Sequence, residues 1–492
     1  MRKLLYCVVA LMAFVGTTSA QIPGIPEEVR FRLELTPNAD SVVVDSTLTS
    51  WGMRFEHTYG KYWTAWFDVW RAGAWADSLL KQRWTSVVVA DVFNPIPVPD
   101  SLQPSMMLEE IGAPQGIQWG VAMVKAPQSW ARGIDGSGIV VGVLDSGTDC
   151  GHQDLPNLRG GYNFGQLPAG VTDRASCAAF ASMSICRHHG FHTAGTVAGQ
   201  NGIGVAPGAQ VYAMRVFDEI NATCGAWTGT QLAALAMAAD SGWDTNASIG
   251  GSGAGSYSIM TMRYAKERST YMSASAGNDG GSRLLYPAGY NATVSVGALT
   301  SSGARASYSN RGSNLDVSAP GSSVVSLAPN NGYATKSGTS MAAPHVAGCM
   351  ALIRQARELV MGRPRLSITE TKMVLAITAV DLGTPGKDTY YGNGGIDCDA
   401  AVAFILSGAP IPAPYLNLPT GYTISRTANS GSPASTMTPY SAQVDTWEFD
   451  KADLPSGYEV NVNPWSTDAT LRGYVNNTAT PLRSYTLPII WW

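Results

Sequence analysis

The chain has 492 residues, enough for roughly two or three domains and a large hydrophobic core. Its formal net charge is −4 and only 14% of its residues are charged, so electrostatics give no reason to expect nucleic acid or an anionic membrane as a partner. Abundant small residues with few charges are typical of an extracellular enzyme.

Residues 1–20 have the pattern of a secretory signal peptide. Arg2 and Lys3 precede an apolar stretch at 4–15, and small residues follow up to Ala20. This arrangement predicts cleavage after Ala20 and export of the mature protein. No other segment is apolar over the length of a membrane span, so we expect a soluble, secreted protein.

Residues 21–93 are typical of a separate, small α+β unit. Alternating apolar and polar residues predict a strand through Val29, Phe31, Leu33 and Leu35. Residues 74–82 are helical in character, and 84–93 predict another strand. The connector that follows, 94–99, is rich in proline and should be extended and exposed.

Two groups that could activate a hydroxyl nucleophile come next. A β-branched apolar run at 139–144 predicts a central parallel strand that ends at Asp145. Asp145 should therefore lie at the carboxyl edge of the sheet, where open α/β folds build their sites. A helix of small residues is predicted at 189–199, and it begins with His189, a candidate base.

Strands and helices alternate through the middle of the chain. Buried strands are predicted at 211–217, 271–276 and 293–298, and helices at 228–241 and 367–379. Gly242 directly follows the first of these helices and should cap its carboxyl end. The alternation predicts an α/β fold with a doubly wound, mostly parallel sheet and helices on both faces.

A candidate nucleophile and a candidate oxyanion donor complete the pattern. The strand of small residues at 273–276 is followed by Asn278, a neutral N–H donor. Ser340 precedes an apolar run, 341–353, which lacks strand alternation and predicts a buried helix, with Pro344 near the first turn. Ser340 would lie at the amino end of this helix, where unpaired N–H groups favour a developing negative charge.

With these blocks in the order Asp, His, Ser, the chain resembles the subtilisin-like serine proteases, the subtilase family. The resemblance implies that Asp145 orients the imidazole of His189, which acts as general base and then acid. It implies that Ser340 attacks the peptide carbonyl, while Asn278 and the backbone N–H of Ser340 hold the oxyanion. The similarity runs from about Gln118 to about Ser407 and includes shorter matches at 119–121, 126–130, 204–207, 248–251, 286–288, 318–321 and 391–394.

The resemblance also implies how substrate binds. An extended polypeptide would add as a strand to an exposed backbone edge formed by Ser248, Ile249, Gly250 and Gly251. Ala276 and Gly277 would help to wall the specificity pocket. No charge is clearly aimed there, so we expect uncharged, apolar side chains in it. Catalysis would need no cofactor and no metal, and we expect a monomer with no nucleic-acid or membrane partner.

The family pattern implies a domain order. Residues 21–117 are similar in position to the propeptides of subtilases, which assist folding and inhibit the enzyme until they are cut away. An ordinary amino-terminal domain is the alternative. Residues 118–408 would form the catalytic domain. Residues 409–492 comprise a proline-rich linker and a β-rich segment of unassigned role. This segment is either an accessory β domain or a poorly ordered tail. Its alternating residues Tyr458–Val462 predict a strand, and Trp447 and Phe449 could anchor a small β module.

Departures from the family pattern surround the expected site. Phe191 and Thr193 stand where the family usually has Thr and Val. The interval from Asp145 to His189 is long, which indicates an inserted loop. The stretch 199–204 is shorter than the loop that holds a tight calcium in many subtilases, so that site is expected to be absent, while a structural calcium elsewhere is left open.

Cysteines point to disulfides in an exported chain. Removing Cys7 with the signal peptide leaves six, which allow up to three disulfides and 15 pairings. Cys177 with Cys186 is the first pairing to expect, because it closes a short loop. Cys349 falls inside the apolar helix and can be a small buried hydrophobe.

Two rival functions are weighed against proteolysis. His188 and His192 lie four apart, like zinc ligands on one helical face, but the glutamate expected between them and an obvious third ligand are lacking. His192 and His345 match family positions that support structure. The other rival is a binding pseudoprotease whose site is spoiled by Phe191 and Thr193, although every catalytic group is present.

Overall fold

A computed structural model of the chain describes residues 114, 116–220, 223–251, 270–290 and 292–412, together with the strands and the helix at 28–35, 41–50, 54–59, 62–68, 85–90, 93–95, 424–426, 435–437, 458–461, 469–473 and 485–487. The predicted signal peptide and the predicted helix at 74–82 lie outside these residues, as do Trp447 and Phe449. Within these ranges, no helix has both the length and the apolar character needed to cross a bilayer.

Seven parallel strands form the central sheet, in the order β14-β13-β12-β11-β6-β8-β7. Their bounds are Val140–Asp145 (β6), Leu158–Asn163 (β7), Gln210–Arg215 (β8), Asp244–Ala247 (β11), Met272–Ser275 (β12), Thr293–Leu299 (β13) and Val317–Pro320 (β14). Val141 and Val143 of β6 belong to one hydrophobic cluster, whereas Leu144 belongs to another. A sheet buried on both faces confirms the predicted doubly wound fold.

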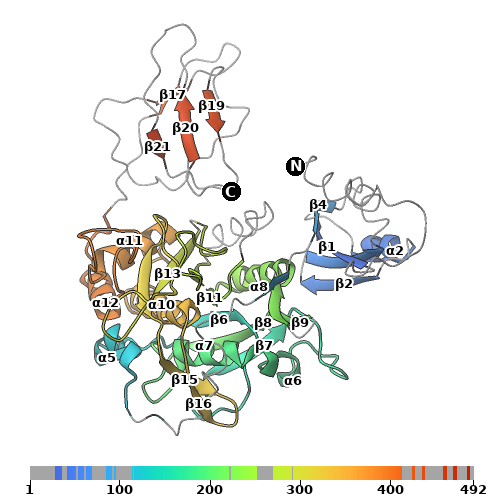
Figure 1. The fold of residues 1–492 in the computed structure, drawn as a ribbon, viewed down its shortest axis with the longest axis horizontal. Helices are drawn as coiled ribbons and strands as arrows, with labels where there is room; N and C mark the ends of the chain where they lie inside the picture. Colours follow the sequence, from blue (N-terminus) through green and yellow to red (C-terminus); the bar gives the residue numbers. More distant parts are fainter. Residues whose placement is uncertain are drawn as a thin grey trace.

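Helices cover both faces of this sheet (Figure 1). Helices α7 (His189–Ala198) and α10 (Thr339–Arg354) pack on one face, and α8 (Thr228–Ser241) packs on the other. The other helical segments described in this region are α4 (Trp119–Met123), α5 (Ala126–Ala131), α6 (Cys177–Phe180), η2 (Ser184–Cys186), η3 (Gln355–Val360), α11 (Ile368–Thr378) and α12 (Cys398–Ser407). Strands β15 (Val324–Ala328) and β16 (Gly332–Lys336) form an antiparallel hairpin. The predicted helices at 228–241 and 367–379 are confirmed, and Gly242 caps α8 with φ 69°.

The helix that carries Ser340 begins earlier than predicted. Because α10 starts at Thr339, Pro344 lies inside the helix rather than in its first turn. Proline has no N–H, so it cannot bond to the carbonyl of Ser340 four residues before it. The Ser248 hydroxyl donates to that carbonyl instead, at 2.7 Å. This bond ties the first turn of α10 to the end of β11.

The amino-terminal unit is an antiparallel sheet in the order β2-β3-β1-β4, with helix α2. Its elements are β1 (Glu28–Leu35), α2 (Ser41–Ser50), β2 (Arg54–Tyr59), β3 (Tyr62–Asp68) and β4 (Thr85–Ala90). The strand predicted through Val29 to Leu35 is confirmed by β1. Helix α2 was not predicted, because three consecutive valines favour strands. This sheet packs through β2 and β3 beside α8 (Figure 1).

A second small sheet joins the amino-terminal segment to the catalytic region. Strand β5 (Phe93–Pro95) pairs antiparallel with β10 (Thr223–Trp227), which pairs with β9 (Phe217–Ile220). The predicted strand at 84–93 is thus two strands in different sheets, β4 and β5. The start of the proline-rich connector is extended as predicted, but it is paired with β10 over Asn94 and Pro95.

Short antiparallel strands occur near the carboxyl end. They are β17 (Ile424–Arg426), β18 (Ser435–Met437), β19 (Tyr458–Asn461), β20 (Ala469–Gly473) and β21 (Tyr485–Leu487). Strand β19 agrees with the alternation seen at 458–462.

Two disulfides cross-link the inserted loop between Asp145 and His189. They join Cys150 to Cys177 and Cys186 to Cys224, with Cα–Cα distances of 6.2 and 5.3 Å. The expected pairing of Cys177 with Cys186 is therefore wrong. Loop length favoured that local pair, but tertiary packing sets β10 beside η2 and so brings Cys224 to Cys186. Two further cysteines, Cys349 and Cys398, are buried thiols, as expected for Cys349.

Candidate active site

Asp145 is a buried carboxylate at the carboxyl end of β6. Its side chain is 1% exposed. The Ser146 backbone N–H donates to Oδ1 at 2.7 Å, and the Thr193 hydroxyl lies 3.4 Å from Oδ2. His189 Nδ1 lies 2.8 and 3.0 Å from the two oxygens. Both oxygens of this carboxylate therefore face hydrogen-bond donors.

His189 begins helix α7 and approaches Asp145 very closely. The next residue, Gly190, has no room for a side chain, since an added Cβ would lie 2.8 Å from Asp145 Cβ and 2.6 Å from the Gly147 carbonyl oxygen. Its N–H donates to the Ser146 hydroxyl at 2.9 Å. Because a carboxylate oxygen accepts, Nδ1 of His189 is the nitrogen that donates, and in the tautomer with this single proton Nε2 keeps its lone pair. That lone pair is what a general base requires.

Ser340 lies in the first turn of α10 and is 7% exposed. Its hydroxyl has no hydrogen bond with another described residue, His189 included. Helices α7 and α10, which carry His189 and Ser340 in their first turns, pack against each other. The structure therefore places Asp145 in contact with His189, and it gives the Ser340 hydroxyl no partner within the described part of the chain.

Asn278 follows β12 and faces the same helix terminus. Its Oδ1 accepts from the backbone N–H and the hydroxyl of Thr339, both at 2.8 Å. Because a backbone N–H can only donate, this bond fixes the orientation of the amide, and Nδ2 is left without a partner among the described residues. A Cβ built on Gly338 would lie 3.5 Å from Nδ2 and 3.6 Å from the Ser340 nitrogen. The Asn278 amide nitrogen and the Ser340 backbone nitrogen therefore lie close together at the amino end of α10.

Three hydroxyl residues that support these groups were not singled out from the sequence. Thr339 holds Asn278 and accepts from the Gly277 N–H at 3.1 Å. The Ser146 backbone N–H and the Thr193 hydroxyl donate to the carboxylate of Asp145. Thr193 was noted only as a departure from the family pattern. The only sequence signal for these residues was their closeness to Asp145, His189 and Ser340 along the chain. Thr193 and Thr339 make their contacts with segments far away in the sequence, which no local pattern reveals.

The residues expected to bind substrate flank this centre. Ser248 and Ile249 are buried, and Gly250 and Gly251 are partly exposed. Gly251 exchanges both backbone hydrogen bonds with Tyr286 at 2.9 Å, so its own backbone is already paired.

The second expected wall is also largely buried. Ala276 packs with Leu284 and Leu315, and Gly277 leads directly into Asn278. Strand β10 was not predicted as a binding edge. Its pairing with β5 shows that an extended segment fits along it.

His188 and His192 make hydrogen bonds within the protein. His192 Nε2 lies 3.0 and 3.1 Å from the carbonyl oxygens of Val324 and Ala334, so it donates there and is not a metal ligand through that atom. Burial lowers the pKa of His192 well below its usual value. His188 Nδ1 lies 2.6 Å from the Ser182 hydroxyl. The described residues contain no cluster of three or more His, Cys, Asp or Glu side chains that could hold a metal.

The short loop at 199–204 is held by hydrogen bonds within the protein. The carbonyl oxygens of Gly199, Gln200 and Gly202 each accept a backbone N–H. The Asn201 side-chain amide donates to Asp154 Oδ1 at 2.6 Å. The expectation that this loop lacks a tight calcium site stays a prediction.

Lys336 places a positive charge near the Asp145–His189 pair. Its ammonium donates to the Arg187 carbonyl. Burial lowers the pKa of Lys336 to about 8, although the nearby Asp145 carboxylate acts in the opposite direction. Burial also lowers the pKa of His188, with Asp149 raising it and Lys336 lowering it further.

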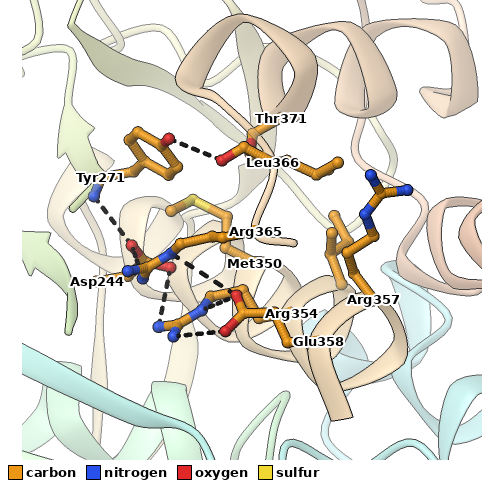
Figure 2. Close-up of a pocket in the computed structure, with 10 residues that line it drawn as sticks. Asp244, Tyr271, Met350, Arg354, Arg357, Glu358, Arg365, Leu366 and Thr371 are labelled. Carbon is orange, nitrogen blue, oxygen red and sulfur yellow. Dashed lines mark hydrogen bonds and ion pairs between the residues drawn. The ribbon is translucent and has the colours of Figure 1, made fainter. Parts of the chain in front are cut away.

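A small pocket at the other end of α10 is lined by a cluster of paired ions (Figure 2). Asp244 accepts from Arg365 at 2.7 Å and from Arg354 at 3.4 Å. Arg354 also bonds to Glu358 at 2.8 Å. Arg354 is 14 residues beyond Ser340, about 21 Å along the helix axis. This cluster is therefore structural and separate from the candidate active site.

Comparisons with known proteins agree with this geometry. The profile of the Subtilase family matches residues 136–394. Subtilisin E of Bacillus subtilis (strain 168) is 37% identical over 297 residues, covering 58% of this chain and 71% of the relative. Subtilisin of Bacillus pumilus is 36% identical and Subtilisin Savinase of Lederbergia lenta 35%, each over 58% of this chain and 99% of the relative.

Proposed function

This chain belongs to the subtilase family and is a serine endopeptidase, and we propose that Ser340 is its nucleophile, with His189 as base and Asp145 as the group that orients the imidazole. The observation that carries the proposal is the contact of His189 Nδ1 with both oxygens of the buried Asp145, at 2.8 and 3.0 Å. This contact supports the tautomer that leaves Nε2 free to accept a proton from a hydroxyl.

The reaction begins when Ser340 Oγ attacks the carbonyl carbon of the scissile peptide bond and His189 Nε2 takes the hydroxyl proton. The carbonyl oxygen becomes an oxyanion and accepts hydrogen bonds from Asn278 Nδ2 and the Ser340 N–H. The peptide C–N bond then breaks, and His189 gives its proton to the leaving amine. A water molecule, activated by the same imidazole, hydrolyses the acyl-enzyme and restores the Ser340 hydroxyl.

The polypeptide substrate binds in an extended form, between β10 and the backbone of Ser248 to Gly251. The pairing of β5 with β10 supports this arrangement, because Phe93–Pro95 lies along β10 as a strand. We assign residues 21–117 as a propeptide that assists folding and covers the substrate edge until it is removed. The packing of β2 and β3 beside α8 supports that assignment.

Residues 1–20 would direct export and be removed, so the mature enzyme would be extracellular. This part of the proposal rests on the basic, apolar and small-residue pattern before Ala20. Catalysis would require no cofactor, and the enzyme would act as a monomer.

Hydrolysis of an internally quenched peptide by the purified, matured protein tests the proposal. A fluorophosphonate should abolish hydrolysis, because it reacts with an activated serine, and a zinc chelator should leave the rate unchanged. Loss of hydrolysis with the chelator and resistance to the fluorophosphonate would favour the metallohydrolase alternative.

A further inference from the structure

Leu285 occupies the space beside the scissile-bond site. A Cβ built on Gly250 would lie 2.7 Å from Leu285 Cδ1, and a Cβ built on Gly277 would lie 2.8 Å from Leu285 Cγ. Both distances are well inside van der Waals contact. The α-carbons of the two glycines therefore face each other across the leucine side chain, which fills the space between them.

This space adjoins the reacting atoms from two directions. On one side, Gly277 immediately precedes Asn278, the proposed oxyanion donor. On the other side, Gly250 lies two residues after Ser248, whose hydroxyl donates to the Ser340 carbonyl at 2.7 Å. The side chain of the substrate residue that contributes the scissile carbonyl would consequently be directed between Gly250 and Gly277.

Backbone hydrogen bonds hold Leu285 in place. Its N–H donates to the Ala276 carbonyl at 3.0 Å, and the next residue, Tyr286, exchanges two bonds of 2.9 Å with Gly251. The segment 285–286 thus bridges the two walls. The leucine is partly exposed, as expected of a side chain that a substrate would contact.

The polar group beside Gly277 is largely occupied. Asn310 Nδ2 donates to the Arg283 carbonyl at 3.0 Å, and its Oδ1 accepts from the N–H groups of Asp279 and Gly281, both at 3.1 Å. The oxygen is saturated, and the amide carries no charge that could pair with a charged substrate side chain. The space is therefore bounded by the carbons of Leu285 and by a neutral amide held to its own surroundings.

We propose that Leu285 is a specificity-determining residue, which shortens the specificity pocket so that the enzyme cleaves after small, uncharged residues such as alanine. The inference rests on the proposed function, since it requires Ser340 and Asn278 to hold the scissile carbonyl. It narrows the sequence-based expectation of an uncharged, apolar preference to small side chains.

The test uses peptide p-nitroanilides that differ only in the residue before the cleaved bond: alanine, leucine or phenylalanine. Titration with a fluorophosphonate counts competent sites independently of this residue. We expect kcat/KM for alanine to exceed that for phenylalanine by about tenfold or more. Leu285→Ala should reverse the order by raising the phenylalanine value.

Leu359→Ala is a matched control. Leu359 also packs on a glycine, with its Cδ1 2.7 Å from a Cβ built on Gly138, but it lies in η3, beyond the far end of α10. This variant should keep the alanine-to-phenylalanine ratio of the parent enzyme. If Leu285→Ala does not fold, the alanine-to-phenylalanine ratio of kcat/KM is compared between Leu285→Val and the parent enzyme, and that comparison tests the role of Leu285.

A parent enzyme that prefers phenylalanine, or a titratable Leu285→Ala enzyme with an unchanged ratio, would overturn the role of Leu285 and leave the proposed function intact. Failure to cleave any substrate, together with no titratable serine, would instead overturn the proposed function and with it this inference.

Discussion

The polar groups at the two ends of helix α10 differ in whether they have hydrogen-bond partners. At the carboxyl end, two carboxylates and two guanidinium groups, those of Asp244, Glu358, Arg354 and Arg365, neutralise one another (Figure 2). At the amino end, the Ser340 hydroxyl and Asn278 Nδ2 have no partner among the described residues. Paired groups have little capacity to bind anything else, whereas donors without a partner can still bind a ligand. We therefore expect reactivity at the amino end of α10 and a contribution to stability at its carboxyl end.

The largest effect should come from Ser340→Ala. Removing the hydroxyl should lower kcat by about 10⁶-fold, a magnitude measured for subtilisin itself. The far-UV circular dichroism spectrum and the melting temperature should stay close to those of the parent, because the hydroxyl bonds to no described residue. Ser337→Ala is the control: its hydroxyl accepts from the Ser323 N–H at 2.8 Å, and activity should be kept. Appreciable turnover by Ser340→Ala would remove Ser340 from the mechanism.

Asp244→Ala should affect the opposite end of the helix in the opposite way. It leaves two partly buried guanidinium groups with Glu358 as their remaining carboxylate partner, so unfolding by denaturant should show a loss of up to about 3–5 kcal/mol. Active-site-normalised kcat/KM should hardly change. Asp399→Ala, which breaks the more exposed Arg132 pair, should cost less than about 1 kcal/mol. Equal losses in the two variants would mean that burial does not set the strength of these pairs.

Asn278→Ala should lower kcat by about 10²–10³-fold with little change in KM, the range known for this donor in subtilisin. Asn278→Asp separates its two roles, because a carboxylate can still accept from Thr339 but cannot donate to an oxyanion. Steady-state kinetics should show at least as large a loss for Asn278→Asp. Near-normal turnover by this variant would show that Asn278 matters only as support for Thr339.

His345 should make the α10 region sensitive to acid. Burial lowers the pKa of His345 to about 4 from 6.5, so the unfolded chain binds more protons between these values. The neutral His345 therefore contributes fully to the free energy of unfolding above pH 6.5, and this contribution is lost as the pH falls to about 4. We expect it to be about 3 kcal/mol. Denaturant unfolding of His345→Gln should show a flatter decline across this range, and an unchanged slope would contradict the assignment.

The sequence predicted most of the catalytic region, for identifiable reasons. The strand before Asp145, the helix that begins with His189 and α8 with its Gly242 cap all have local signals in hydrophobic pattern or turn chemistry. Family membership, expected from the ordered Asp, His and Ser blocks, is confirmed.

Features that depend on tertiary packing could not be predicted. The Cys186–Cys224 disulfide, the pairing of β5 with β10 and the position of Leu285 each join segments far apart in sequence. Pro344 was placed near a helix start because the bond from Ser248 that compensates for it is also long-range. The roles of the site residues stay predictions until they are tested.

Peptide mapping by mass spectrometry after treatment with a fluorophosphonate tests the reactive end of α10 most directly. We expect one adduct per chain, on Ser340, and no adduct in His189→Ala under the same conditions. An adduct on another serine, or equal labelling of Ser340 without His189, would contradict the assignment of this cluster as the catalytic centre.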